Sequence, residues 1–173
     1  MAIKNNWNDQ KSLPKDLIIA KERVYDCCNF EVTQPQAALE SADYDAYHFD
    51  LNGNHICYRT AKITPKKTGQ FVTLWKRNTT GILEPITFLD LIDFVIISVR
   101  KNELYGQFIF PKSILLEKGI FSTANKEGKR ATRIYPPWDE TTSKQAQKTQ
   151  QWQLDYFHEI IPNANLDRFK ALF

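Results

Sequence analysis

The chain has 173 residues, of which 42% are hydrophobic and 25% are charged, and this is enough to bury one sizeable core. It has no run of about 18 apolar residues that would indicate a membrane span, and its first residues lack the apolar segment of a secretory signal. We therefore expect a single domain over residues 1–173, located in the cytoplasm and without a membrane partner.

The cysteines are three in number, and Cys27 and Cys28 are adjacent while Cys57 is distant. An odd count with this spacing fits reduced thiols better than a disulfide framework. We expect no disulfide-linked partner.

The N-terminal part of the chain predicts a helix followed by a β-hairpin. Apolar residues recur at helical spacing over residues 12–30, and residues 35–40 are expected to add a short helical turn. Over residues 44–61, two β-rich runs flank Asn52-Gly53, a dipeptide favoured in two-residue hairpin turns. Pairing Leu51 with Asn54 predicts the register, with Tyr47 opposite Tyr58 on the apolar face.

The rest of the chain predicts alternating strands and helices. After a turn at residues 64–69, residues 70–77 read as a strand, and Thr87 to Asp90 resemble a capping box that opens a short helical turn. Residues 94–99 and 105–110 are expected to be neighbouring central strands, because the first is a continuous apolar run. Further elements are expected as a helix over 111–118, short strands over 120–122 and 131–135, a helix over 143–161 and a turn near 167–172. This order predicts an α+β fold with a mixed central β-sheet flanked by helices.

A basic stretch over residues 58–77 is the strongest functional signal. No Asp or Glu occurs between Leu51 and Leu83, although the whole chain carries a net charge of only +3. Cations that follow phosphates, mixed with aromatic rings that stack on bases, are typical of sites for single-stranded nucleic acid. The opposite interpretation is also open, in which Phe71 and Trp75 are core residues and the cations form a solvated rim.

The candidate phosphate-binding residues come from this stretch and from a second basic cluster around Gly128. They are Arg59, Lys62, Lys66, Lys67, Lys76, Arg77, Lys129, Arg130 and Arg133, with Tyr58, Trp75 and Trp138 as candidate stacking residues.

A metal site on the predicted hairpin is a weaker hypothesis. His48, Asp50, His55 and Cys57 share its polar face, but no Cys-x-x-Cys or His-x-x-x-His spacing supports zinc binding. We predict no metal site there and a cross-strand hydrogen bond between Asp50 and His55.

Several runs in the same order resemble the MepB family, over about residues 44–157. The runs are 61–65 (AKITP), 68–77 (TGQFVTLWKR), 105–112 (YGQFIFPK), 128–130 (GKR), 133–139 (RIYPPWD) and 145–154 (QAQKTQQWQL). The resemblance implies a PD-(D/E)XK endonuclease-like fold, here with an additional N-terminal hairpin. It also implies nucleic-acid binding, with the endonuclease catalytic set poorly kept.

The sequence itself indicates a degenerate catalytic site. A working site of the nuclease-like fold needs an acid at the start of one central strand, and on the next strand an acid or Gln, one intervening residue and a lysine. If Asp93 is the first acid, the second group falls on residues 107–109, and Ile109 stands where the lysine is required. An apolar side chain cannot hold a metal or stabilise charge, so only Lys112 or Lys76 offers a replacement.

We therefore predict a nucleic-acid-binding protein that favours single-stranded DNA or RNA over duplex and needs no cofactor. Two alternatives stay open. One is a protein-interaction module, suggested by the glutamine-rich C-terminal helix. The other is a nuclease that uses Mg²⁺ or Mn²⁺, with an active site drawn from Glu40, Asp90, Asp93, Gln107 and Lys112.

Overall fold

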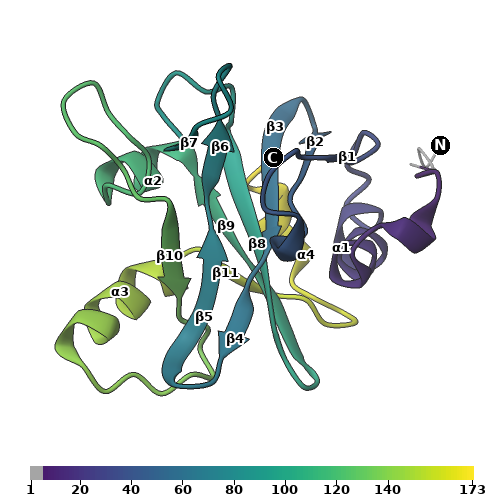
Figure 1. The fold of residues 1–173 in the computed structure, drawn as a ribbon. Coiled ribbons are helices and arrows are strands. Elements are labelled where there is room, and N and C mark those ends of the chain that lie inside the picture. The colour runs from purple at the N-terminus through teal and green to yellow at the C-terminus, as the bar shows by residue number, and fades with distance from the viewer. Residues whose placement is uncertain (1–5) are drawn as a thin grey trace.

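A computed structural model describes residues 6–173, and a mixed six-stranded sheet forms its centre (Figure 1). Its strands, in spatial order, are β1 (Gln36–Ala37), β2 (Tyr47–Leu51), β3 (Asn54–Thr60), β8 (Phe94–Lys101), β9 (Leu104–Pro111) and β11 (Phe157–Glu159). Strands β3 and β8 run parallel, and the other neighbours are antiparallel. The expected α+β class with a mixed central sheet is confirmed.

Two smaller sheets and several short helices complete the fold. One sheet has the order β10 (Ala131–Ile134), β5 (Lys67–Thr73) and β4 (Lys62–Thr64), and the other pairs β6 (Trp75–Arg77) with β7 (Leu83–Pro85). The helices are η1 (Gln10–Ser12), α1 (Lys15–Ala20), η2 (Lys21–Tyr25), η3 (Ala42–Tyr44), α2 (Lys112–Glu117), α3 (Lys144–Leu154) and α4 (Leu166–Lys170). Across residues 6–173, each helix is too short or too polar to span a membrane.

The predicted hairpin is present with the predicted register. Leu51 pairs with Asn54 and Tyr47 with Tyr58. Asn52 and Gly53 both take positive φ, at 47° and 78°, as a type I′ turn requires. The hairpin forms part of the central sheet, because β3 pairs directly with β8.

Several predicted elements differ from the structure, in two cases because backbone pairing replaces helix. The strand expected over 120–122 is reduced to an isolated bridge between Thr87 and Ser122. In the segment expected as a helical turn over 35–40, Gln36 and Ala37 form β1 on the edge of β2. Thr87 to Asp90 form a turn, in which the Asp90 carboxylate accepts a hydrogen bond from the Thr87 amide at 2.7 Å. The expected helix over 143–161 ends at Leu154, and β11 then pairs with β9.

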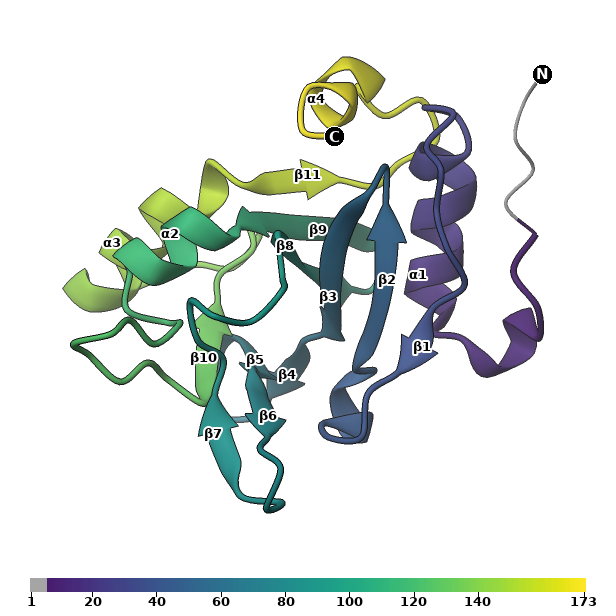
Figure 2. The same cartoon turned by 90° about the horizontal axis from the view of Figure 1, so that it is seen from above.

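The central sheet is covered on both faces (Figure 2). On one face, α1 and η2 bury Leu17, Val24 and Tyr25 against β2, β3 and β9. On the other face, β5 and β10 pack Val72 and Ile134 against the apolar residues of β8 and β9.

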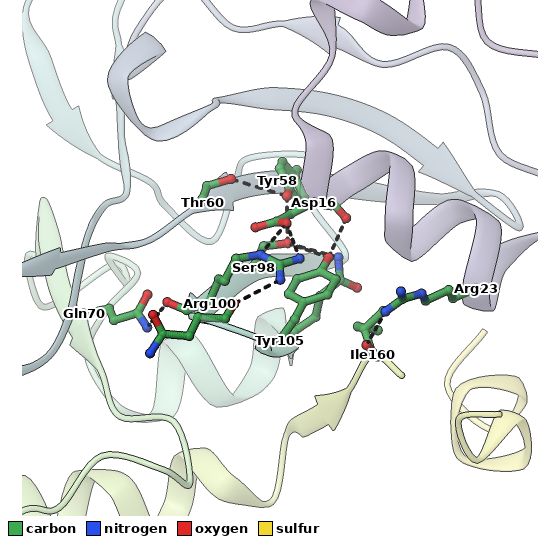
Figure 3. A network of polar contacts seen from close by, with 11 residues as sticks. Asp16, Arg23, Tyr58, Thr60, Gln70, Ser98, Arg100, Tyr105 and Ile160 are labelled. Atoms are coloured by element: carbon green, nitrogen blue, oxygen red, sulfur yellow. Dashed lines mark hydrogen bonds and ion pairs between the residues drawn. The ribbon is translucent and has the colours of Figure 1, made fainter. Parts of the chain in front are cut away.

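A buried polar network joins the first face to α1 and η2 (Figure 3). Ser98 lies at its centre, where its hydroxyl oxygen accepts from the Tyr58 hydroxyl at 2.7 Å and from the Gln107 amide at 3.2 Å. Gln107 in turn accepts from the Tyr25 hydroxyl at 2.8 Å, and the Tyr105 hydroxyl donates to the carbonyl oxygen of Asp16. Burial raises the pKa values of all three tyrosines, so their hydroxyls stay protonated.

The network generates a stability prediction. Replacing Gln107 with Leu leaves the buried Tyr25 hydroxyl without its acceptor, so the free energy of unfolding should fall by about 1–3 kcal/mol. Urea denaturation measures this change. Glu103→Gln, in the exposed β8–β9 turn, is the control and should shift stability by less than about 0.5 kcal/mol. An equally small effect of Gln107→Leu would show that the network contributes no stability.

A second prediction concerns pH and the C-terminal helix. His158 is buried beneath Phe169 of α4, with ring centroids 5.0 Å apart, and burial together with the charge of Arg168 lowers its pKa from 6.5 to about 4. As the pH falls, His158 therefore takes up a proton in the unfolded chain at a higher pH than in the folded chain. Stability should fall as pH drops from about 6.5 to about 4, by on the order of 3 kcal/mol.

Thermal denaturation across this pH range tests the prediction with His158→Leu as the comparison. The variant should lose this part of the pH dependence and keep the part due to carboxylates. Identical pH profiles for the two proteins would contradict it.

Candidate nucleic-acid interface

The outward face of the β4–β5–β10 sheet carries a row of cations around an aromatic ring. Alternation along β5 buries Val72 and leaves Phe71 partly exposed on the opposite face. The register places Lys62 of β4 and Arg133 of β10 directly beside Phe71, one on each side. Three strands therefore align two cations and a ring across one surface.

A second ring extends this row. Tyr44 of η3 lies 6.0 Å from Phe71 between ring centroids, and the Lys62 ammonium lies 4.9 Å from the Tyr44 centroid. The Arg133 guanidinium lies 5.9 Å from the Phe71 centroid. These distances are those of cation–π contacts, which hold each charge close to an aromatic face. We call Tyr44, Lys62, Phe71 and Arg133 the basic-aromatic row.

Arg133 is held in place by the ends of β4 and β5 on either side of their connecting turn. It donates to the Thr64 hydroxyl at 2.9 Å and, more weakly, to the carbonyl oxygens of Thr68 and Gly69 at 3.3 and 3.4 Å. Gly69 has φ of 83°, and a Cβ at this position would lie 2.7 Å from the Tyr135 ring. Glycine therefore permits both the backbone conformation and the close packing of Tyr135.

Helix α3 lies beside β10 and forms a groove with the sheet (Figure 1). The buried Gln153 attaches the helix to the strand edge, because its amide accepts from the Tyr135 backbone at 2.8 Å and donates to the Arg133 carbonyl at 2.9 Å. The groove encloses about 560 Å³. Its lining, which contains no acid, is Lys67, Phe71, Lys129, Ala131, Thr132, Arg133, Tyr135, Ser143, Gln145, Ala146 and Thr149.

Four other predicted cations are also exposed, and of these Lys129 lines the groove beside α3. Lys66 lies at the tip of the β4–β5 turn, as expected, and lines a shallow groove that also contains Asp139 and Glu140. Lys129 is exposed, whereas Arg130 forms an ion pair with Glu127 at 3.0 Å. Arg77 is exposed in β6 and donates to the Gly81 carbonyl.

Two predicted phosphate contacts are corrected by the structure. Arg59 is fully buried, so it cannot reach a ligand on the surface; it donates to the Tyr58 carbonyl, and its Nε has no partner among residues 6–173. Lys76 is bound to Asp90 at 2.8 Å and lies 3.5 Å from Glu84. Burial opposes the charge of Lys76, but the bond to Asp90 outweighs this effect and raises its pKa.

The three predicted stacking residues are largely used within the fold. Tyr58 is fully buried in the network around Ser98. Trp75 and Trp138 are partly buried, and their indole nitrogens are enclosed without a partner among the described residues. Trp138 packs edge-on against Phe157. Tyr44, Phe71 and Tyr135 are also partly buried but lie at the interface, and strand alternation was the signal that could have placed Phe71 there.

The structure brings together three of the candidate nuclease residues and places a fourth elsewhere. Gln107 is buried in the network on the α1 side of the sheet, far from Asp93, which precedes β8 and accepts from the His55 amide at 2.8 Å. Glu40 lies in the loop after β1, and Lys112 donates to the Asp90 carbonyl. Asp90, Asp93 and Lys112 therefore lie close together, whereas Gln107 lies apart from them in the buried network.

The Asp90 carboxylate is occupied by contacts within the fold. The Asp90 carboxylate already accepts from Lys76 and Thr87; burial would raise its pKa, but these bonds lower it. No group of three or more His, Cys, Asp or Glu side chains within residues 6–173 is placed to hold a metal ion. On the hairpin, Asp50 and His55 form the predicted cross-strand bond at 2.6 Å.

Arg59 generates a further prediction. Arg59 has no ionic partner within residues 6–173, and a buried unpaired charge is costly. Arg59→Met should therefore raise the free energy of unfolding by about 1–4 kcal/mol and leave nucleic-acid affinity unchanged. Arg77→Met, at an exposed site, is the matched control and should change stability by less than about 0.5 kcal/mol. Destabilisation by Arg59→Met in a denaturant titration would contradict the prediction.

Comparison with known proteins identifies the relatives of the chain. A family model described as MepB-like matches residues 38–159. The crystal structure of MepB is 34% identical, covers 85% of this chain and 97% of its own, and superposes with a TM-score of 0.73. The bacterial homing endonuclease I-Ssp6803I is 15% identical, covers 96% of this chain and 97% of its own, and has a TM-score of 0.45.

No curated protein matches the chain. The family model nevertheless spans most of its 173 residues, and the similarity to MepB covers nearly all of that relative. The chain belongs to the MepB-like family.

Proposed function

We propose that this protein binds nucleic acid across the outward face of the β4–β5–β10 sheet. The observation that supports this proposal best is the basic-aromatic row, in which Lys62, Phe71 and Arg133 align in register on three strands. Lys66, Lys67 and Lys129 surround the row with further exposed positive charge. This arrangement suits a strand whose phosphates meet the cations while its bases lie on the rings.

The partner in this proposal is single-stranded DNA or RNA rather than duplex. Phe71 and Tyr44 are partly exposed on the sheet, where an unpaired base can stack on them. In a duplex the base faces are stacked on one another and cannot reach such rings without unpairing. Stacking of one base is worth about 1–3 kcal/mol, which favours the single strand.

The proposal includes binding without cleavage, in the cytoplasm. One support is Ile109, which is buried at the position where the nuclease pattern requires a lysine. Another is the separation of Gln107 from Asp93, because Gln107 pairs with Ser98 while Asp93 precedes the first residue of β8. The three cysteines are free thiols, which fits a reducing compartment.

Charge reversal on the interface tests the proposal. The double variant Lys62→Glu/Lys129→Glu should weaken binding of a labelled RNA of about 12 nucleotides by at least about tenfold. Its plot of log affinity against log salt should also be less steep, because two phosphate contacts are lost, each contributing a slope of about 0.7. Fluorescence anisotropy over a salt series measures both effects.

The control is Lys11→Glu/Lys15→Glu, which changes the net charge of the protein by the same amount as the interface variant. Its two substitutions lie on η1 and α1, away from the interface. It should keep the affinity within about twofold of the unmodified protein if local contacts dominate. Unchanged binding by the interface variant would contradict the proposal and favour a protein-interaction module.

Incubation of labelled single strands with Mg²⁺ or Mn²⁺ tests the absence of cleavage. The expected result is intact oligonucleotide. Fragments that appear with the unmodified protein and disappear with Asp93→Ala would overturn this part of the proposal.

A further inference from the structure

We infer that the groove between the β5–β10 face and α3 is a binding site for one nucleotide of the strand, with the base inside the groove and the phosphate at its rim. This inference rests on the proposed function and specifies where a single base is held. The groove encloses about 560 Å³, a size at which protein pockets bury small ligands.

The charge of the groove distinguishes it from other concave surfaces on the molecule. Lys67, Lys129 and Arg133 line it together with neutral side chains. Four other surface grooves each include at least one carboxylate, for example Asp16 in one and Asp155 in another. An acid-free groove with three cations favours a phosphorylated ligand.

The aromatic rings of the groove suit a base. Phe71 lines the groove from β5, and Tyr135 lines it where its ring covers Gly69. Opposite them, the first turns of α3 present Ala146 and Thr149, which are small side chains that leave room for a planar group. A base between a ring and a helix wall is buried on both faces.

Hydrogen-bonding groups in the groove are available for the edge of a base. The side chains of Thr132, Gln145 and Thr149 make no hydrogen bond to any residue among 6–173. Gln145 carries both a donor and an acceptor, the pair that base edges require. By contrast, Gln153 on the same helix uses both its carbonyl oxygen and its amide nitrogen in attaching α3 to β10.

The groove walls are fixed before any ligand arrives. Gln153 holds α3 against the β10 edge, and Arg133 is held by Thr64 at 2.9 Å. Such a preformed site loses little conformational entropy on binding. Even a single nucleotide should therefore bind measurably without the rest of the strand.

The test is a titration of the full chain with nucleoside 5′-monophosphates, followed by NMR of the backbone amides. Saturable shifts are expected at Ala131, Arg133 and Gln145, with inorganic phosphate binding at least about fivefold more weakly because it lacks the stacked base. Equal binding of phosphate alone would overturn the inference, since the groove would then hold only an anion.

Two variants that fill the groove complete the test. Ala146→Phe and Thr149→Phe should each abolish the nucleotide-dependent shifts, whereas Gln151→Phe, on α3 but outside the groove, should retain them. Amide spectra show whether each variant is folded. Retained shifts in both folded groove variants would overturn the inference.

The outcomes for this inference and for the proposed function are separate. If the RNA binds and the Lys62→Glu/Lys129→Glu variant loses it, but mononucleotides cause no shifts in the groove, then the groove inference fails and the proposed function stands. If neither RNA nor mononucleotide binds, both fail.

Discussion

The structure depends on the hydrogen-bond network around Ser98, which lies between the central sheet and the N-terminal helices. Buried hydroxyl and amide groups are costly unless they are paired. Tyr25, Tyr58 and Gln107 find their partners only when η2, β3 and β9 meet in one arrangement. The network therefore fixes both the register of the central strands and the position of η2. This helix lies before the part of the chain that matches the family model.

The register of the central sheet in turn positions the interface. The chain leaves β3 and returns as β4 and β5, whose apolar face packs Val72 against the far side of the sheet. The buried Gln70 donates to the Arg100 carbonyl of β8 at 3.2 Å, which attaches β5 to the central sheet. Because side chains alternate along a strand, this packing turns Phe71 outward together with its neighbours Lys62 and Arg133.

The cations of one short basic stretch end in three different environments. Arg59 is buried, Lys76 is neutralised by Asp90, and Lys62 lies on the exposed face. All three come from the same acid-free stretch, so the difference arises from the strand that carries each residue and from the face to which its side chain points. A positive field that is uniform in the sequence thus becomes concentrated on the β4–β5–β10 face.

The sequence by itself determined the features that depend on neighbouring residues. Asn52-Gly53 determined the hairpin and its register, and the apolar run at 94–99 determined a buried central strand, because turn geometry and strand burial are short-range properties. Only the tertiary structure decided where long-range pairing overrides local preference. It replaced helix with β1 and β11, buried Arg59, and used Gln153 to close one groove against α3. These outcomes depend on which strand edge has unpaired backbone groups, a property that the local sequence does not contain.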